Sequence, residues 1–233
     1  MRRSNDYKSW PVCFGLVIWI AATACGGAEQ EVLRRFFRAT MNEDTNTVAA
    51  LSLVSFPGGA VESWDVVEVG PTTREPFKLS ELRSRAETAK IERDAQFAVF
   101  SDFRLANYSD LWLIEERLEQ NPDYPFRGKL AHLHAKYQSY RKERAVLELA
   151  LREIKKTMGD EKKPARKSVM TSDDIELFDG EVLTRKVVVD VETASDLVAA
   201  YVLTFRKYDL TNRQNEFTPP SRWIIVSIQE QET

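Results

Sequence analysis

The sequence predicts an α+β protein in which N-terminal helices pack on an antiparallel sheet and a long antiparallel coiled-coil hairpin is inserted. Three observations predict it: apolar residues recur at helical spacing near the N-terminus, follow heptads in a charge-rich middle region, and alternate with polar residues near the C-terminus. We divide the chain into a signal peptide (1–24), the first part of the α+β domain (25–78), the hairpin (79–160) and the C-terminal strands that complete the domain (161–233).

The first segment has the order of an export signal. Arg2, Arg3 and Lys8 precede an apolar run from Trp10 to Ala24. The run spans about 15 residues, whereas a membrane-spanning helix needs about 20. We therefore expect a cleaved signal peptide. Its removal takes away three basic residues and one acidic residue (Asp6), so the net charge changes from −3 to −5.

The end of this run, Ala22-Thr23-Ala24-Cys25-Gly26, resembles the lipobox of bacterial lipoproteins. The resemblance implies a diacylglyceryl group on the sulfur of Cys25, which two acyl chains make a stable membrane anchor. It also implies a place in the bacterial cell envelope, on the outer side of the cytoplasmic membrane or on the outer membrane. The alternative is an ordinary cleaved signal with an incidental cysteine. The mature chain has no cysteine pair, so no intrachain disulfide forms.

The next elements are two helices and a strand. Between Glu29 and Asn42 the apolar residues recur at helical spacing, which predicts an amphipathic helix. Asp44 and Thr45 provide capping chemistry for a shorter helix that ends before Pro57. Alternating residues from 63 to 69 then predict a strand.

The middle of the chain predicts two long helices, over 79–120 and 126–158, joined by the turn-forming segment 121–125. The second helix carries a heptad seam interrupted only by Arg144, which we interpret as a register device or a side chain that extends to solvent. The seam comprises Phe126, Leu130, Leu133, Tyr137, Tyr140, Arg144, Leu147, Leu151, Ile154 and Met158. The first helix offers a looser stripe of Leu82, Ala86, Ala89, Phe97, Phe100, Leu111, Ile114 and Leu118.

The remaining segment predicts a linker and three antiparallel strands. Residues 161–167 are charged and contain Pro164, so we expect a linker there. Residues 186–192 alternate apolar and polar side chains, which is the period of a half-buried strand. Further strands are expected over 197–207 and 222–228.

This element order, with a closing strand that begins Ser221-Arg222-Trp223-Ile224-Ile225, resembles the nuclear transport factor 2-like (cystatin-like) superfamily. The resemblance covers Glu29 to Val69 and Leu183 to Gln229 and implies a curved sheet wrapped around the first helix into a cone. Candidate residues lining such a cavity are Trp64, Tyr201, Phe205 and Trp223, with Tyr208 as a further tyrosine. The alternative for the large aromatic residues is that they form the core.

Few residues indicate a catalytic or metal-binding site. His132 and His134 are two positions apart on a helix, so they diverge by about 200° and do not share a metal ion. Asp190 and Glu192 share a strand face, which we interpret as solvated rather than as a proton-transfer pair. No phosphate loop, nucleophile motif or zinc spacing is present, so we expect no catalytic residue, metal or cofactor. The balanced charge disfavours a nucleic-acid partner.

Two functions follow as hypotheses. The first is a membrane-anchored envelope lipoprotein, a non-enzymatic interaction module that contacts the membrane through the lipid on Cys25 and an envelope protein through the hairpin. The second is a small-molecule-binding protein or enzyme that uses the cone. The oligomeric state stays open, since a heptad pair also suits a four-helix bundle with a second copy.

Overall fold

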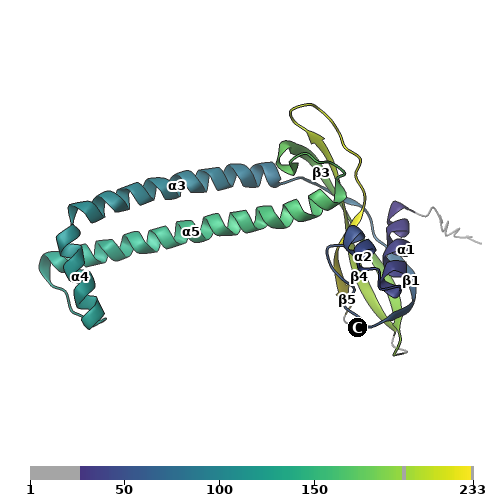
Figure 1. Cartoon of the computed structure of the whole chain (residues 1–233), viewed down its shortest axis with the longest axis horizontal. Helices are drawn as coiled ribbons and strands as arrows, with labels where there is room; N and C mark the ends of the chain where they lie inside the picture. Colours follow the sequence, from purple (N-terminus) through teal and green to yellow (C-terminus); the bar gives the residue numbers. More distant parts are fainter. Residues whose placement is uncertain (1–26, 196–197, 232–233) are drawn as a thin grey trace, which may run out of the picture.

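The computed structural model describes residues 27–195 and 198–231 and shows an α+β protein (Figure 1). The predicted signal peptide and Cys25 lie outside the described residues. The helices and strands, in chain order, are α1 (Ala28–Met41), α2 (Thr45–Leu51), β1 (Val61–Val69), β2 (Thr73–Pro76), α3 (Leu79–Ala106), α4 (Tyr108–Gln120), α5 (Gly128–Ser168), the short 3₁₀ helix η1 (Ile175–Leu177), β3 (Phe178–Thr193), β4 (Val198–Asn212) and β5 (Ile224–Glu230).

The two N-terminal helices form where the sequence predicted them. One stripe of α1 is buried, and it includes the fully buried Leu33, Phe36 and Phe37. The carboxylate of Asp44 accepts a hydrogen bond from the backbone N–H of Thr47 at 3.0 Å, which caps α2. The predicted capping chemistry is therefore confirmed.

The sheet is antiparallel, with the order β1-β3-β4-β5, and β2 pairs with β3. The three predicted C-terminal strands are confirmed, but β3 begins at Phe178 and β4 runs on to Asn212, so both are longer than expected. The short strand β2 was not predicted. All of its residues are exposed, so it lacks the apolar alternation that marks a strand in a sequence.

The long strands β3 and β4 contribute to two hydrophobic cores on opposite faces of the sheet. Toward one end, Val187, Val189 and Leu203 face α1 and form what we call the α1 core. Toward the other end, Val182 and Tyr208 face α5 and η1 and form the arm-base core. Adjacent residues of a strand point to opposite faces, which explains how one strand serves both cores.

Gly180 lies where β3 serves the arm-base core, and only glycine fits there. Its φ is +151°, and a Cβ at this position would lie 2.2 Å from the carbonyl oxygen of Asp209 on β4. This close approach of two strand backbones requires a residue without a side chain.

The helices α3, α4 and α5 form an arm that extends from one end of the sheet (Figure 1). α3 and α5 lie side by side and run in opposite directions, and α4 lies at the far end. At 1.5 Å per residue, α5 is about 60 Å long. α1 lies on the side of the domain away from the arm. Within the described residues, no helix is both long and apolar enough to cross a membrane.

The prediction of one continuous helix over 79–120 is wrong. The helix breaks at Asn107, whose side-chain amide donates a hydrogen bond to the carbonyl of Phe103 at 2.8 Å and so ends α3. Asparagine competes with the helix for backbone hydrogen bonds in this way.

The predicted linker over 161–167 is also wrong, because α5 continues through it to Ser168. Pro164 lies inside the helix, although proline removes a helical hydrogen bond. Pro164, Ala165 and Ser168 are all buried, and Ala165 is part of the arm-base core. Burial against the sheet therefore compensates for the lost hydrogen bond and keeps this segment helical.

Candidate interaction surface on the arm

The residues proposed to line a cavity lie in the α1 core. Tyr201, Phe205 and Trp223 are buried members of it, and Trp64 packs against it. The ring of Trp64 stacks on Phe37, with ring centroids 4.9 Å apart. These aromatic residues therefore lie in or against a packed core, which is the alternative that the sequence analysis gave for them. The further tyrosine, Tyr208, lies in the other core, and burial raises the pKa of its hydroxyl.

The domain also contains a buried ion pair that the sequence analysis missed. Glu29 at the start of α1 is nearly inaccessible to solvent and pairs with Arg185 on β3. Arg185 also donates to the hydroxyl of Thr72 at 2.8 Å and lies over the ring of Trp223. These partners balance charges that would otherwise be costly to bury, so the pair fixes the start of α1 to the sheet.

A groove of about 650 Å³ lies beside α2 rather than inside the α1 core. Val48 and Ala49 of α2, Leu53 and Phe56 of the following loop, and Lys167 of α5 contribute to its lining. The ammonium of Lys167 donates to the carbonyls of Ala49 and Ser52. Because Ala49 lies in the last turn of α2 and Ser52 directly follows the helix, this lysine acts first as a structural cap.

The histidines and carboxylates considered for chemistry do not form a site. His132 is exposed, while His134 contacts Phe126 and hydrogen bonds with Gln138 at 3.2 Å. Glu192 accepts a hydrogen bond from the hydroxyl of Ser63 at 2.7 Å, and Asp190 lies opposite Asp65 on β1. Across the part of the chain that the structure describes, no group of three potential ligands is placed to hold a metal ion.

The arm buries its heptad seam unevenly. Near its far end, Phe100, Leu111, Ile114, Leu133 and Tyr137 form a compact core, which we call the distal core. The hydroxyl of Tyr137 donates to Glu115 at 2.8 Å, and burial raises the pKa of this tyrosine.

The middle of the arm is different, because α3 presents small and polar side chains there. Between the two ends of α3, the partly buried residues include Ala86, Ala89, Arg93 and Gln96. The amide of Gln96 hydrogen bonds with Glu143 on α5. Phe97, which the sequence analysis assigned to the buried stripe, is instead 52% exposed. The seam position Arg144 lies over the Phe97 ring at 5.5 Å and pairs with Glu148 at 2.8 Å.

Large apolar side chains are exposed where α3 meets α4. The exposed fractions are 74% for Leu105, 67% for Tyr108 and 58% for Trp112. Tyr108 and Trp112 are four residues apart on α4, so they share one side of that helix, and Leu105 at the end of α3 lines the same shallow pocket as Tyr108. We call them the distal apolar surface. Contiguous apolar surface of this kind marks sites of protein contact.

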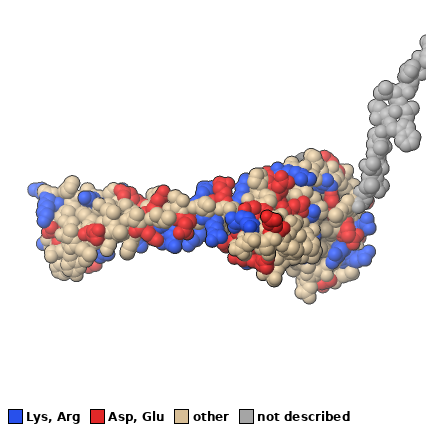
Figure 2. Space-filling model, turned by 90° about the horizontal axis from the view of Figure 1, so that it is seen from above, with Lys and Arg blue, Asp and Glu red and all other residues tan. Residues whose placement is uncertain are grey.

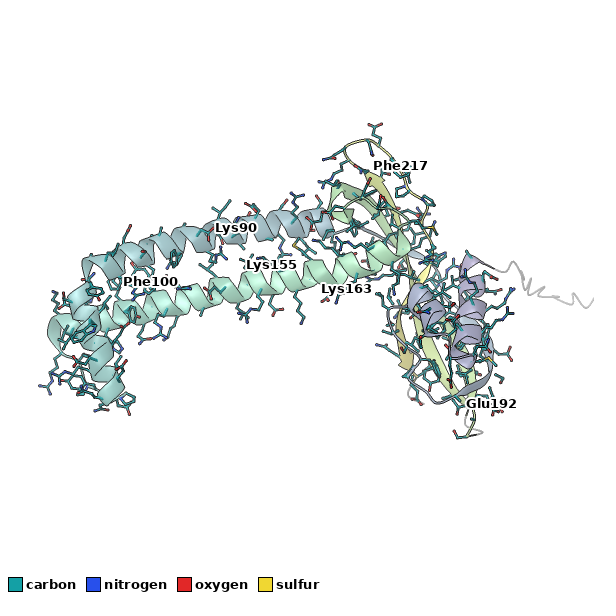
Figure 3. The ribbon with its side chains drawn as sticks, in the orientation of Figure 1. Lys90, Phe100, Lys155, Lys163, Glu192 and Phe217 are labelled. Carbon is teal, nitrogen blue, oxygen red and sulfur yellow. The ribbon has the colours of Figure 1, made fainter. Side chains whose placement is uncertain are left out.

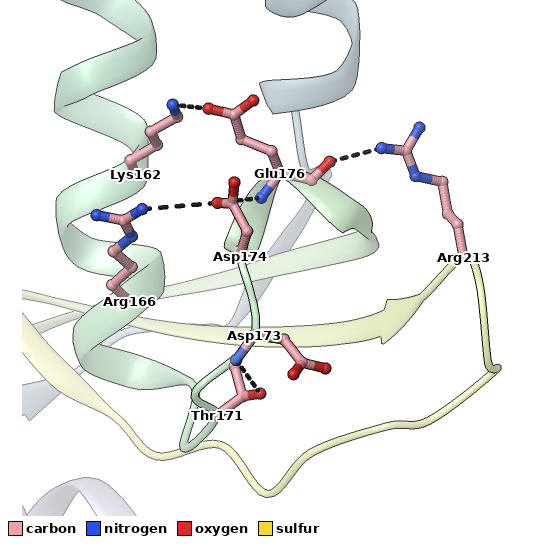
Figure 4. Close-up of polar contacts among 7 residues, drawn as sticks. All are labelled: Lys162, Arg166, Thr171, Asp173, Asp174, Glu176 and Arg213. Atoms are coloured by element: carbon pink, nitrogen blue, oxygen red, sulfur yellow. Dashed lines mark hydrogen bonds and ion pairs between the residues drawn. The ribbon is translucent and has the colours of Figure 1, made fainter.

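The base of the arm is fixed to the domain by polar contacts (Figure 4). Lys162 and Arg166 of α5 pair with Glu176 and Asp174 of the segment that leads into β3. The guanidinium of Arg213, at the end of β4, donates to the backbone carbonyl of Glu176. The contacts join α5, η1 and β4, so the arm has a defined direction relative to the sheet.

A partly buried carboxylate lies at the same base. Glu161 on α5 pairs with Arg206 on β4 at 3.6 Å, beside the fully buried Tyr208. Burial raises the pKa of Glu161, and the nearby Arg206 opposes this effect only in part. We interpret this group as part of the joint between arm and domain.

The sequence analysis missed the distal apolar surface. The heptad register contained the necessary signal, because Leu105, Tyr108 and Trp112 are large apolar residues that fall outside the seam.

Compared with protein-family models, with curated proteins and with solved structures, the chain matches none of them.

Proposed function

We propose that this protein is a lipid-anchored protein of the bacterial cell envelope and that its arm binds another envelope protein. The observation that carries the proposal is the distal apolar surface, because Leu105, Tyr108 and Trp112 remain exposed at the end of the arm farthest from the domain. Burying a large apolar side chain in a contact yields about 1.5 to 3 kcal/mol, so a partner would gain from covering this surface.

The placement of the two ends supports the proposed anchor. α1 starts at Ala28, three residues after Cys25, and an extended chain of three residues spans about 10 Å. Since α1 lies on the side of the domain away from the arm, a lipid on Cys25 would hold that side near the membrane (Figure 1). The arm would then extend away from the lipid.

The finer fold assignments belong to the same proposal. We propose that the arm is a coiled-coil hairpin, since its α5 seam residues are all at least partly buried. We also propose that the domain is nuclear transport factor 2-like, which the packing of α1 on long antiparallel strands supports. The small-molecule hypothesis has less support, because the cavity residues that it requires are packed in or against the α1 core.

The anchor is tested by mass spectrometry of the mature N-terminus from native membranes. We expect a chain that starts at Cys25 with a diacylglyceryl group on its sulfur. Replacing Cys25→Ser should move the protein from the membrane fraction to the soluble fraction, since the thiol chemistry is lost. An intact Met1, or a mature terminus with an unmodified sulfur, would refute the anchor.

The arm's role is tested by placing a photo-crosslinking residue at Trp112 in the full chain. Val67 on β1 is the matched control, because its exposed fraction is 59% and that of Trp112 is 58%. We expect one other envelope protein to be captured at Trp112 and at Tyr108, but not at Val67. Leu105→Asp should reduce that capture at least tenfold. Equal capture at Val67, or no dependence on Leu105, would contradict the proposal.

A further inference from the structure

A groove of about 410 Å³ lies between α3 and α5 near the base of the arm. Arg83 and Lys90 of α3 and Lys155 and Lys162 of α5 contribute to its walls. Figure 3 shows Lys90 on α3 and Lys155 on α5, and Figure 2 shows basic side chains gathered where the arm joins the domain. We call this the basic groove. Its volume is that of a site for a small organic molecule.

The floor of the basic groove is apolar. Leu151 is almost completely buried there, and Met158 is partly buried against the arm-base core. Among the described residues that line the groove, none has an aromatic ring. The unbranched thioether side chain of methionine adapts to apolar groups of different shapes. Such a floor suits an aliphatic chain.

Gly159 keeps the basic groove open. It lies inside α5, where glycine is less favourable than any residue except proline. Packing does not require glycine there, because a Cβ at this position would have no heavy atom within 4 Å. From α3, the small Ala86 lines the same groove. The groove is therefore space that two small residues leave between the helices, at a cost to the stability of α5.

Three of the four cations in the walls lack a partner within the protein. Lys162 pairs with Glu176 of η1, whereas the other three make no ion pair within residues 27–195 and 198–231. Among the described residues of the groove, Glu87 supplies the only carboxylate. The free cations therefore exceed the carboxylate by two positive charges. Like charges held close together repel one another, so the groove favours an anion with two negative charges.

The larger groove beside α2 does not offer such free charge. Of the described residues that line it, Lys167 is the single cation. Its ammonium already donates to the carbonyls of Ala49 and Ser52. Of the two grooves, the basic groove is therefore the one whose cations are available to a ligand.

We propose that the basic groove binds a phosphate monoester that carries an aliphatic chain. Such a phosphate has a charge of about −1.5 to −2 at pH 7, which balances the excess charge of the groove, whereas a single carboxylate balances only half of it. The guanidinium of Arg83 can donate to two phosphate oxygens at once, and the ammonium groups of Lys90 and Lys155 add point charges.

The aliphatic chain lies on the apolar floor. The groove residues of α5 extend from Leu151 to Lys162, which is roughly 16 Å along the helix axis. The chain contacts Leu151 and Met158 over this length, while the phosphate stays at the charged rim. The inference does not depend on the proposed envelope partner, because the groove lies at the base of the arm and the distal apolar surface lies at its far end.

Isothermal titration calorimetry of the full chain with Cys25→Ser tests the site, since no lipid is then attached at residue 25. Decyl phosphate, used below the concentration at which it forms micelles, should bind at one saturable site. Decanoate should bind about fivefold or more weakly because it has one charge, and inorganic phosphate about tenfold or more weakly because it has no chain. Equal affinity for inorganic phosphate, or similar affinity for the cation decyltrimethylammonium, would overturn the proposal.

Charge variants locate the bound phosphate. The double variant Lys90→Gln, Lys155→Gln should weaken the binding of decyl phosphate about tenfold or more. The matched control is Lys156→Gln, Lys163→Gln, because both are exposed lysines of α5 that do not line the groove. The control should bind as the parent protein does. An equal loss in both double variants would mean general attraction to a basic surface, and the proposed site would be wrong.

A third variant fills the groove without changing its charge. Gly159→Leu places a side chain in the open space and should also weaken the binding of decyl phosphate about tenfold, whereas Gly159→Ala should change it less. Circular dichroism and thermal denaturation verify that both variants fold. Unchanged affinity in a folded Gly159→Leu variant would show that the ligand does not occupy this space.

Vesicles distinguish two sources of the same phosphate monoester. Flotation with phosphatidylcholine vesicles that contain phosphatidic acid offers the group within a bilayer. Capture by these vesicles that is lost in Lys90→Gln, Lys155→Gln would identify a membrane lipid as the ligand. Binding of decyl phosphate without capture would identify a molecule taken from solution. Failure of both ligands to bind would overturn the proposal.

Discussion

The α1 core and the middle of the arm use their apolar residues in opposite ways. In the α1 core, strands and helices far apart in the chain bring Phe36, Phe37 and Phe205 into complete burial. In the arm, α3 faces its partner with Ala86, Ala89 and Gln96, while large residues such as Leu105 and Trp112 remain exposed. The difference indicates that the domain uses apolar residues for stability, whereas the arm leaves several of them exposed, as the proposed contact with a partner requires.

The largest expected effect comes from Phe37→Ala. Phe37 is fully buried and contacts the rings of Phe36, Phe56 and Trp64, so its removal should lower the free energy of unfolding by about 3 to 5 kcal/mol. Trp112→Ala, in the arm, should change it by no more than about 0.5 kcal/mol. Urea denaturation of both variants measures the contrast, and similar losses would break the comparison.

Two glycines give a second contrast of opposite sign. Gly180→Ala should destabilise the protein by more than about 1 kcal/mol, because a Cβ there meets the backbone of Asp209 and φ is unfavourable. Gly159→Ala, inside α5, should stabilise it by up to about 1 kcal/mol, because a Cβ there has no heavy atom within 4 Å and alanine favours the helix. Thermal denaturation measures both, and a loss of stability in Gly159→Ala would show that this position needs glycine.

The smallest expected effect concerns pH and the joint between the two regions. Burial raises the pKa of Glu161 above its ordinary value of 4.5, so the folded protein binds more protons than the unfolded chain just above that pH. Stability should therefore decrease as pH rises from 4.5 through the folded pKa, and Glu161→Gln should remove this decrease. Urea denaturation at pH 4 and pH 7 measures it. The exposed Glu153 on the same helix supplies the control substitution, and an identical profile for both variants would contradict the assignment.

The sequence predicted the helices and strands that have a single buried face. α1 and the second half of β3 follow simple periods, and both form as expected. The first half of β3 was missed because Val182 and Leu183 are adjacent and both buried, each in a different core. Alternation is lost where a strand changes the face that it buries, so periodicity alone does not identify such a segment.

The predictions for the arm failed at single residues whose effect depends on context. Pro164 usually ends a helix, but here the buried Ala165 and Ser168 hold the last turns of α5 against the sheet. Asn107 is an ordinary polar residue in the sequence, and only its hydrogen bond to Phe103 shows that α3 ends there. Exposure of Phe97 likewise depends on where α5 lies, which no local pattern contains.

Because α5 is attached to the domain at one end only, small motions at that end are amplified along its length. The ion pairs of Lys162 and Arg166 fasten one end of a helix that is about 60 Å long. A tilt of about 5° at that fulcrum moves the opposite end by roughly 5 Å, because displacement grows in proportion to helix length. Small rearrangements of the strands beneath α5 would therefore displace Trp112 by several ångströms. A force applied at Trp112 would likewise be transmitted to the sheet.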